Sequence, residues 1–431
     1  MLRFFSYVIV LSLVVAPRPL SAHAHDLSHL ARSAVSCGGG PHAHDVTRRM
    51  VASLPDPNAG FGPRAGVVVS ALDATRHLAY LQLGSSWGDE ATSLTVVDLR
   101  SGRVARTIRV AAPFQYFALD AARGRIITGN LGDSTGGTAS TYSLIDVSTG
   151  RTLAVRTSRR LSLRTVVIDD ATGHAFLVYA TSIDMVDDRT GAVLTSIVTP
   201  RGAGAQALVD RPAHRLFVRA GYRGDGLTSL LTLDTRSGRL VRAVTLRGPG
   251  PMTVDEGAGR VFVTTDNGDS VTTLDAATAR ILRRERIPAS GDLALDARGH
   301  RVYVTDVSPR DVAAAKVTES ISVLDAHTGA TLATVPLFTL DRPDQRQVLY
   351  PGYITAVDGR RSRLFFYTTP LDAVGADGSP LTLRVLDART LHVLQTRDDG
   401  ERGYGYVVLV DDGLSRALLL PPFGVADLAC V

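Results

Sequence analysis

The chain has 431 residues, of which 45% are hydrophobic and 21% charged, and its formal net charge is +5. Its arginines are spread along the chain between aspartates, and Lys316 is the only lysine. A nucleic-acid-binding surface needs clustered basic residues, so this pattern excludes nucleic acid as the expected partner. The length would allow two or three domains, but one repeat spans nearly all of it and predicts a single large domain.

The first 24 residues predict a secretory signal peptide. Arg3 supplies the positive charge, residues 4–16 are apolar, and residues 22–24 (AHA) form a small-x-small cleavage site. The apolar run of 13 residues is too short for a comfortable membrane span, which needs about 20. We therefore expect an extracytoplasmic protein, secreted or held in the periplasm or at the cell surface, without a transmembrane span in the mature chain. An uncleaved anchor is the alternative.

Residues 25–66 predict a flexible N-terminal segment that contributes one strand. Residues 48–55 (RRMVASLP) have the character of a lone strand, and residues 56–66 are a linker rich in glycine and proline. The segment also holds a histidine cluster, and such tracts can bind copper or zinc. The spacing is irregular, so we expect only adventitious metal binding and assign no metal site. The cluster comprises His25, His29, His42 and His44.

The chain has two cysteines, Cys37 and Cys430. In an exported protein such a pair predicts one disulfide. Because it would enclose almost the whole mature chain, it would stabilise the fold by on the order of 5 kcal/mol in the loop-closure model. The alternative is a lipid-modified Cys37, against which the polar and charged residues that precede it argue.

From residue 67 onward, one pattern occurs eight times: an apolar run, an aspartate, four residues, and usually an arginine that opens the next apolar run. Six copies fit without adjustment: Asp120/Arg125, Asp210/Arg215, Asp255/Arg260, Asp296/Arg301, Asp358/Arg363 and Asp411/Arg416. Asp169/His174 and Asp73/Leu78 are relaxed copies. Such an aspartate can close the turn between two strands through side-chain to backbone hydrogen bonds. We expect the arginine to reach back to that aspartate, as a structural feature and not a catalytic one.

A second pattern alternates with the first: an apolar run, an aspartate, three residues and a glycine. It occurs at Asp98/Gly102, Asp146/Gly150, Asp187/Gly191, Asp234/Gly238 and Asp325/Gly329, with Asp275/Ala279 and Asp387/Leu391 as relaxed copies. Within one unit, four strands are predicted at residues 252–254, 261–264, 270–274 and 280–287. The mean period is about 48 residues, which is typical of an all-β propeller with four-stranded blades.

Eight aspartate-ended strands, each lining the central axis, predict eight blades. The last unit lacks a fourth strand, and the strand predicted at 48–55 has no unit of its own. Pairing them would complete the last blade from both ends of the chain and remove its free edges. We therefore expect a propeller over residues 67–431, closed by a composite N- and C-terminal blade. Seven blades with an appended hairpin is the alternative.

The repeat resembles the YVTN-type β-propeller family. Residues 261–287, 302–307 and 320–337 carry the likeness, with an aromatic-Val-Thr strand, a Val-Leu-Asp strand and a Thr-Gly turn. The resemblance covers about residues 67–421 and implies the propeller fold. It implies little about activity, because this family and its relatives include binding proteins, scaffolds and a few enzymes, so function must be argued from sites.

Histidine positions argue against several chemistries. If the strands of each blade are called A to D from the axis outward, the A–B and C–D turns share one face of a propeller. His77, His174, His214 and His300 fall in A–B turns, and His327 and His392 in C–D turns. The opposite mouth, formed by B–C and D–A loops, is expected to lack histidine and cysteine. This argues against haem, copper clusters and Ser-His-Asp catalysis, and we predict no cofactor.

The mouth is the predicted binding surface, because its loops are long and differ between units, as binding loops on rigid scaffolds do. The candidate ligand-binding residues are Trp87 in a B–C loop and six residues just before A strands: Tyr116, Arg164, Gln206, Asp292, Tyr353 and Tyr406. This mixture suits an unknown protein, a peptide or a polar ligand. The alternative is that these side chains simply fill and hydrate the channel.

Taken together, these features predict a monomeric, non-catalytic binding scaffold. The alternative is a lactonase-like hydrolase or lyase that uses carboxylates and arginine at the mouth. A pair of close acids with raised pKa values there would favour the enzyme, whereas an apolar or aromatic surface would favour the scaffold.

Overall fold

The computed structural model describes residues 49–50, 66–84, 90–132, 139–158, 160, 162–199, 203–220, 226–248, 250–287, 290–308, 316–341, 353–368, 380–402, 407–411, 413–420 and 427–430. All of them belong to one compact unit, Cys37–Val431. The predicted signal peptide, the histidine cluster and Cys37 lie outside the described residues, so the Cys37–Cys430 disulfide remains a prediction.

The described residues form eight four-stranded antiparallel sheets, numbered here in chain order. Sheets one and two contain, from the inner to the outer strand, β2 (Gly66–Asp73), β3 (Leu78–Gly84), β4 (Ala91–Asp98) and β5 (Arg103–Phe114), then β6 (Tyr116–Asp120), β7 (Arg125–Gly129), β8 (Thr141–Asp146) and β9 (Thr152–Thr157). Sheets three and four contain β10 (Leu163–Asp169), β11 (His174–Tyr179), β12 (Ser182–Asp187) and β13 (Val193–Val198), then β14 (Ala203–Asp210), β15 (Arg215–Ala220), β16 (Leu227–Asp234) and β17 (Leu240–Arg247).

The second half of the chain repeats this arrangement. Sheets five and six contain β18 (Met252–Asp255), β19 (Arg260–Thr265), β20 (Ser270–Asp275) and β21 (Ile281–Arg286), then β22 (Ser290–Asp296), β23 (Arg301–Ser308), β24 (Lys316–Asp325) and β25 (Thr331–Asp341). Sheet seven contains β26 (Tyr353–Asp358), β27 (Arg363–Thr368), β28 (Pro380–Asp387) and β29 (Val393–Arg402). One short 3-10 helix, η1 (Asp266–Gly268), joins β19 to β20. Among all the residues that the structure describes, no helix is long and apolar enough to cross a membrane.

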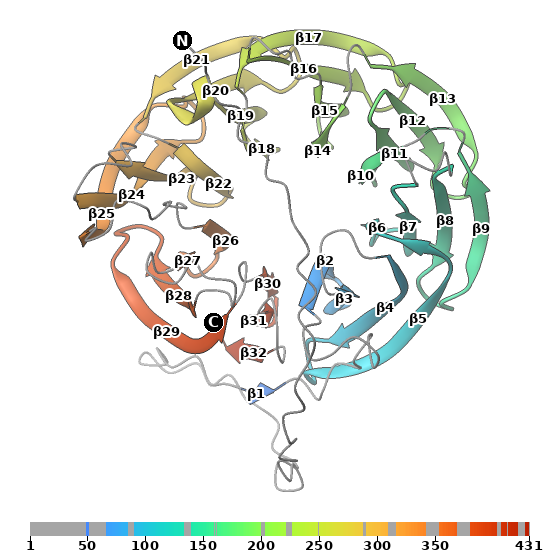
Figure 1. Cartoon of the computed structure of the whole chain (residues 1–431), viewed down its shortest axis with the longest axis horizontal. Helices are drawn as coiled ribbons and strands as arrows, with labels where there is room; N and C mark the ends of the chain where they lie inside the picture. The colour runs from blue at the N-terminus through green and yellow to red at the C-terminus, as the bar shows by residue number, and fades with distance from the viewer. Residues whose placement is uncertain are drawn as a thin grey trace, which may run out of the picture. The chain divides into compact units, whose positions relative to one another are not determined.

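Both ends of the chain build the eighth sheet. Its order is β30 (Val407–Asp411), β31 (Arg416–Leu420), β32 (Asp427–Cys430) and β1 (Arg49–Met50). β1 is antiparallel to β32, with Arg49 opposite Leu428. The expected composite sheet therefore forms, although only two residues of the strand predicted at 48–55 are described. Figure 1 shows the first strand of each sheet toward the centre of this unit and the fourth strand outside.

The repeated aspartates close the turns, as their spacing predicts. At the end of each inner strand the carboxylate accepts a backbone N–H from the following turn, for example Arg76 N–H to Asp73 at 2.9 Å and Ala213 N–H to Asp210 at 2.9 Å. The same bond recurs at Asp120, Asp169, Asp255, Asp296, Asp358 and Asp411. Because both partners lie within three residues, this hydrogen bond is local and could be inferred from sequence.

The third strands of sheets one to seven end in the same way, with a residue of positive φ completing each turn. The carboxylate of Asp187 accepts the Thr190 N–H at 2.7 Å, and Gly191 takes a φ of 69°. The relaxed copies keep this geometry without glycine, because Ala279 and Leu391 adopt φ values of 54° and 60°. Side chains at positive φ are strained, so these two positions hold the left-handed conformation at an energetic cost.

The expected partner of the repeated arginine was wrong. Arg125 and Arg215 do not pair with the aspartate five residues earlier; they bind the aspartate that ends the third strand of their own sheet, Asp146 at 2.5 Å and Asp234 at 2.9 Å. Arg215 lies opposite both aspartates, Asp210 in the ladder on one side and Asp234 in the ladder on the other, so strand pairing alone does not select its partner. The Asp210 carboxylate is engaged instead with the Ala213 N–H of its own turn.

Several of these arginines also link one sheet to the next. Arg215 donates to the carbonyl of Ala277 in sheet five, and Arg260 donates to that of His327 in sheet six. Arg301 reaches the carbonyls of Ala388 and Arg389 in sheet seven. His174, which replaces arginine in sheet three, contacts the Thr235 carbonyl of sheet four through Nδ1 at 2.7 Å. The motif therefore serves the packing of neighbouring sheets.

Replacing Arg260 by methionine, which keeps an apolar stem of similar length, is expected to cost about 1–2 kcal/mol of unfolding free energy. The substitution removes the hydrogen bond to His327 and the ion pair with Asp275 at 3.4 Å. Urea denaturation would measure the loss, with Arg239→Met, at an exposed arginine just before β17, as the matched control. Equal effects of the two changes would contradict the assigned role.

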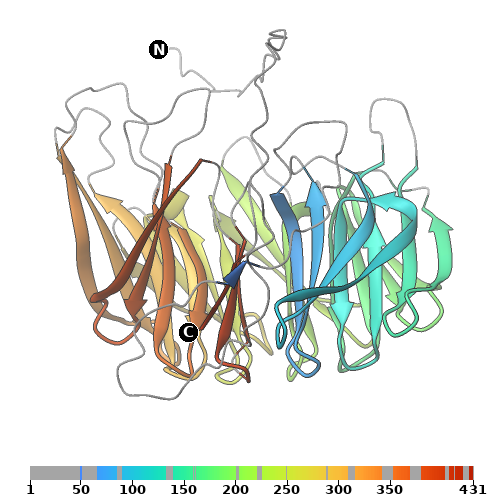
Figure 2. The same cartoon turned by 90° about the horizontal axis from the view of Figure 1, so that it is seen from below.

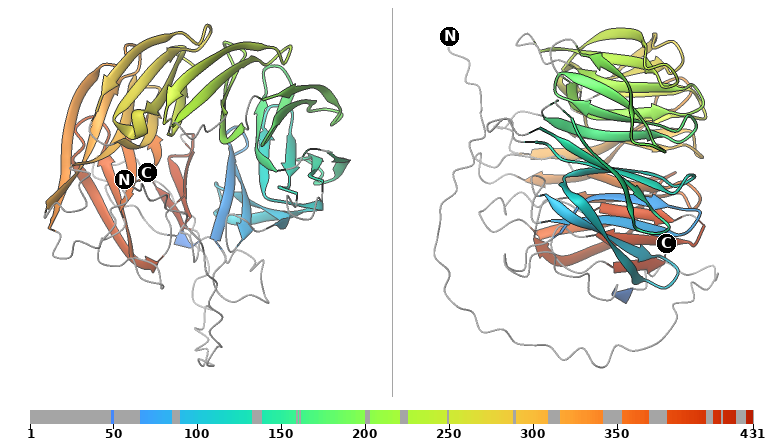
Figure 3. Two further views of the ribbon diagram at one scale, coloured as in Figure 1. Left: turned by 45° about the horizontal axis from the view of Figure 1, so that its top comes forward. Right: turned by 90° about the vertical axis from the view of Figure 1, so that its right-hand side faces the viewer.

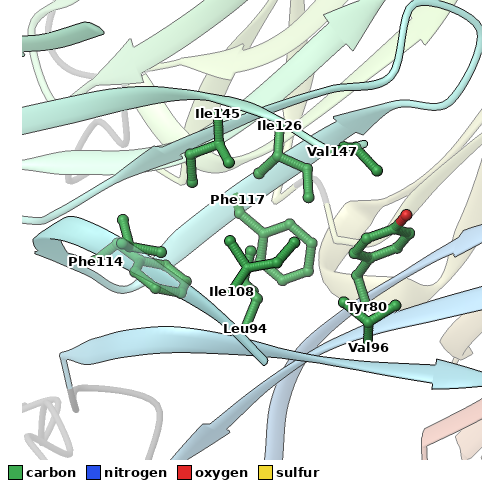
Figure 4. Close-up of a cluster of buried hydrophobic side chains, with 10 residues drawn as sticks. Tyr80, Leu94, Val96, Ile108, Phe114, Phe117, Ile126, Ile145 and Val147 are labelled. Atoms are coloured by element: carbon green, nitrogen blue, oxygen red, sulfur yellow. The ribbon is translucent and has the colours of Figure 1, made fainter. Parts of the chain in front are cut away.

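Apolar side chains fill the space between neighbouring sheets. Between sheets one and two, Tyr80, Leu94 and Val96 pack against Phe117 and Ile126. Figure 4 shows these side chains interleaved from the two sheets. Burying a side chain of this size stabilises the fold by about 1.5–3 kcal/mol, so these contacts are the main source of stability between sheets.

The eighth sheet packs against the first in the same manner. Leu418 of β31 joins Ala79 and Leu81 of β3 in one buried cluster. Arg416 donates to the carbonyls of Leu99 and Arg100, which repeats the link made by the other sheets. His77 of the first sheet lies 2.6 Å from the carboxylate of Asp411 in the eighth.

The two turn types lie at the same end of the strands, as expected. The ring of His300 in an A–B turn lies 4.4 Å from the ring of His327 in a C–D turn of the same sheet. Figure 2 shows these short turns gathered along one edge of the sheets, and Figure 3 shows the sheets side by side from two further directions. The opposite strand ends form the mouth.

Candidate functional site

Five of the seven candidate residues are described, and Trp87 and Tyr406 lie outside the described residues. The five lie within the first residues of inner strands and not just before them, because these strands begin earlier than predicted. The residues by which these inner strands are longer than predicted pair irregularly with the second strand, with register shifts in β10, β14, β22 and β26. All five remain at the mouth end. They are Tyr116, Arg164, Gln206, Asp292 and Tyr353.

Three of these residues stand apart from one another on sheets two, three and four. Tyr116 is half-buried against the apolar cluster between sheets two and three, as a space-filling side chain would be. Gln206 donates to the backbone carbonyl of Met252 on the next inner strand at 3.3 Å. Arg164 is exposed at the start of β10. The structure therefore supports a packing role for Tyr116 and leaves Arg164 accessible.

Asp292 lies in a more distinctive environment. Its backbone N–H donates to Thr305 Oγ1 at 2.7 Å, and its Oδ1 accepts the Leu293 N–H at 2.9 Å. Burial raises the pKa of Asp292 to about 6, an effect that the Leu293 hydrogen bond only partly opposes. A half-buried carboxyl group with a pKa near neutrality is a candidate functional group.

Tyr353 and Tyr367 form an aromatic pair on the neighbouring sheet. They are opposite each other in the β26–β27 ladder, and their rings stack with centroids 5.2 Å apart and an interplanar angle of 19°. Tyr367 is buried whereas Tyr353 is 36% exposed. Burial raises the pKa of Tyr367, and the charges of Tyr353 and Asp292 raise it further. Asp292 therefore acts electrostatically on this pair.

Sequence reasoning missed a second set of polar side chains at the same strand ends. On sheet six, β23 continues to Ser308 and β24 begins at Lys316, so both strands extend toward the mouth. Asp306 is thereby buried, and it accepts a hydrogen bond from Ser322 at 2.9 Å. On sheet seven, Arg384 donates to Thr368 Oγ1 at 2.6 Å. The only sign of these polar side chains in the sequence is that Asp306 and Arg384 each interrupt an otherwise apolar strand.

The acids do not form a coupled pair. Burial raises the pKa of Asp306, whereas Ser322 and Ser320 lower it, and Asp292 is not among the groups that act on it. The shift of the Asp292 pKa is likewise due to burial and to the Leu293 hydrogen bond. Two carboxyls that shared a proton or a nucleophile role would perturb each other. The arrangement therefore offers single acids beside an aromatic pair.

Metal-ligating clusters are not part of this arrangement. Among the described residues, no group of three or more His, Cys, Asp or Glu side chains could hold a metal ion. The described histidines lie in or beside the short turns at the other strand ends, as their spacing predicts.

Comparisons with known proteins support the fold. No family model and no curated protein matches this chain. Among solved structures, BamB from Moraxella catarrhalis is similar over 89% of this chain and all of its own length, with a TM-score of 0.55 and 12% identity. Hydrazine synthase from Kuenenia stuttgartiensis is similar over 85% of this chain and 96% of its own, with a TM-score of 0.49 and 13% identity.

These findings define the class of protein: an all-β propeller of four-stranded sheets. As many as 1449 solved chains match, so the architecture is shared widely and does not by itself indicate an activity.

Proposed function

We propose that this chain is an exported, closed propeller of eight blades that acts as a non-catalytic scaffold and binds a protein, a peptide or a polar ligand at its mouth. The link between the eighth and first sheets, through Arg416 and the His77–Asp411 contact, supports closure because it repeats the links between other sheets. The signal-like first 24 residues support export, and the predicted disulfide would suit it.

The contrast between the two ends of the strands carries this proposal. At the turn end, aspartates recur at equivalent places and are engaged in local hydrogen bonds, as repeated structural features are. At the mouth end, the residue four positions before each inner aspartate varies from sheet to sheet between aliphatic, aromatic, hydroxyl, amide and acidic side chains, and only sheet six has an acid there. The eight residues are Val69, Tyr116, Thr165, Gln206, Pro251, Asp292, Ile354 and Val407. Binding sites on rigid repeat scaffolds are typically formed by positions at which the side chain differs from one repeat to the next.

A second candidate function is a hydrolase or lyase in which Asp292 is the general acid or base. The observation that favours it is the pKa of about 6, which suits proton transfer near neutral pH. Loss of lactone or ester turnover in Asp292→Asn, with the fold intact, would move the protein to this class.

Replacing Tyr353 or Arg164 by alanine is expected to weaken ligand binding at the mouth while changing the melting temperature little. Both side chains are exposed, so neither substitution opens a core cavity. A thermal-shift screen of defined peptides and polar metabolites on the purified mature protein would find ligands, and titration calorimetry would compare the variants. The control is Leu332→Ala, an exposed residue on the outer strand β25. Ligands that bind all four proteins equally would place the site elsewhere.

A further inference from the structure

Asp292 differs from the turn aspartates in the way its charge is balanced. Asp73, Asp120 and Asp358 are each paired with an arginine three residues later. Within the described part of the chain, no arginine or histidine acts on the pKa of Asp292. Removing a carboxylate from water without a partner is costly, and a bound cation would offset that cost.

The neighbouring aromatic pair offers a surface that attracts cations. β22 and β26 are adjacent inner strands, which brings Asp292 beside the sheet that carries Tyr353 and Tyr367. The faces of aromatic rings are electron-rich and bind ammonium groups. Tyr353 is exposed, so a ligand can reach the outer ring while the buried Tyr367 holds it in place.

Sheets six and seven carry two further acids and one arginine toward these strand ends. Asp306 on β23 is fully buried, and its Oδ1 has no hydrogen-bond partner. Glu319 on β24 is buried and acts on Arg384 of β28, whose pKa is lowered by burial and raised by that glutamate. Arg384 is thus balanced by an acid of sheet six, and its hydrogen bond to Thr368 directs it toward its own sheet.

We propose that Asp292, together with the stacked rings of Tyr353 and Tyr367, binds an organic ammonium ion at the mouth. The carboxylate would pair with the positive charge, and the ring of Tyr353 would contact the carbon atoms around the nitrogen. A metal ion is a poorer match, because the described residues provide no cluster of metal ligands. The inference rests on the proposed function and names the ligand chemistry of the same site.

The test is binding of defined probes to the purified mature protein by titration calorimetry and thermal shift. Choline represents a quaternary ammonium, 1,5-diaminopentane a primary ammonium, and 3,3-dimethylbutan-1-ol is the neutral isostere of choline. We expect at least one cation to bind and the neutral alcohol not to bind. Because Asp292 must be ionised, affinity should fall about tenfold from pH 7 to pH 5. Binding and its pH dependence should both be lost in Asp292→Asn, and binding should weaken in Tyr353→Ala.

The controls separate this inference from the proposed function. Asp170→Asn removes a partly exposed carboxylate at the opposite, turn end of sheet three and should bind the cations as the parent does. Equal binding of choline and its neutral isostere, retained in Asp292→Asn, would overturn the ammonium assignment and leave mouth binding intact. Absence of cation binding by the folded protein would also overturn the ammonium assignment. The screen of peptides and metabolites tests the proposed function separately.

Discussion

Replacing Asp188 by asparagine is expected to stabilise this protein at pH 8 by up to about 4 kcal/mol and to change its stability little near pH 4. Asp188 is only 2% exposed. Burial and, next to it, the neighbouring carboxyl of Asp120 raise its pKa to about 7, although Arg123 acts in the opposite direction. At neutral pH the folded protein therefore holds a buried acid that prefers to be protonated.

The sign follows from the two pKa values. In the unfolded chain an aspartate titrates near its ordinary pKa of about 4, so folding takes up a proton between that pH and about 7. The stabilisation by the protonated form is fully present below pH 4 and is lost as the pH rises through 7. Asparagine imitates the protonated carboxyl, since its amide can donate to Asp120, and it does not titrate.

Urea denaturation of both proteins at several pH values between 5 and 8.5 would test this prediction. The difference in unfolding free energy should grow with pH. Asp170→Asn is the control, because that carboxylate is partly exposed and faces Arg211 at 3.2 Å, so its loss should not stabilise the protein at high pH. Parallel pH profiles for the parent and Asp188→Asn would show that Asp188 is ionised at little cost.

Replacing Asp411 by alanine is expected to cost about 3 kcal/mol, the upper end of the range for hydrogen bonds to a charged group. The Asp411 carboxylate is fully buried, accepts the Leu414 N–H at 3.2 Å and lies 2.6 Å from Nδ1 of His77. The substitution removes both a turn contact and the bond between the eighth and first sheets. It would leave the His77 ring facing an apolar side chain.

Asp255→Ala is the matched control for this change. Asp255 is also fully buried and closes its own turn through Gly257 and Ala258, and no ion pair from a neighbouring sheet reaches it in the described residues. Its loss should cost about 1–2 kcal/mol, as for other lost side-chain to backbone bonds. The excess cost of Asp411→Ala measures the link that joins the two ends of the chain. Equal costs would mean that His77 contributes nothing to that link.

Much of the candidate site could not be read from the chain. The sequence pointed to Asp292 and Tyr353 as mouth residues, because they lie four and five residues before the repeated aspartates Asp296 and Asp358. It did not indicate that Tyr367 stacks on Tyr353, nor that Asp292 is half-buried and that no basic side chain among the described residues acts on its pKa. Those properties depend on how far each strand extends toward the mouth and on the side chains of the adjacent sheet. The repeated pattern specifies neither of them.

The sequence by itself determined the strand pattern, the turn chemistry and the pairing of both chain ends in one sheet. These follow from alternating apolar residues and from hydrogen bonds between residues at most three positions apart, as at Asp73 and Arg76. Only the tertiary structure decided the partner of each repeated arginine, the burial of Asp188 and the surroundings of Asp292. The physical reason is distance along the chain: Arg260 meets His327 67 residues away, and burial comes from a neighbouring sheet whose side chains no local pattern specifies.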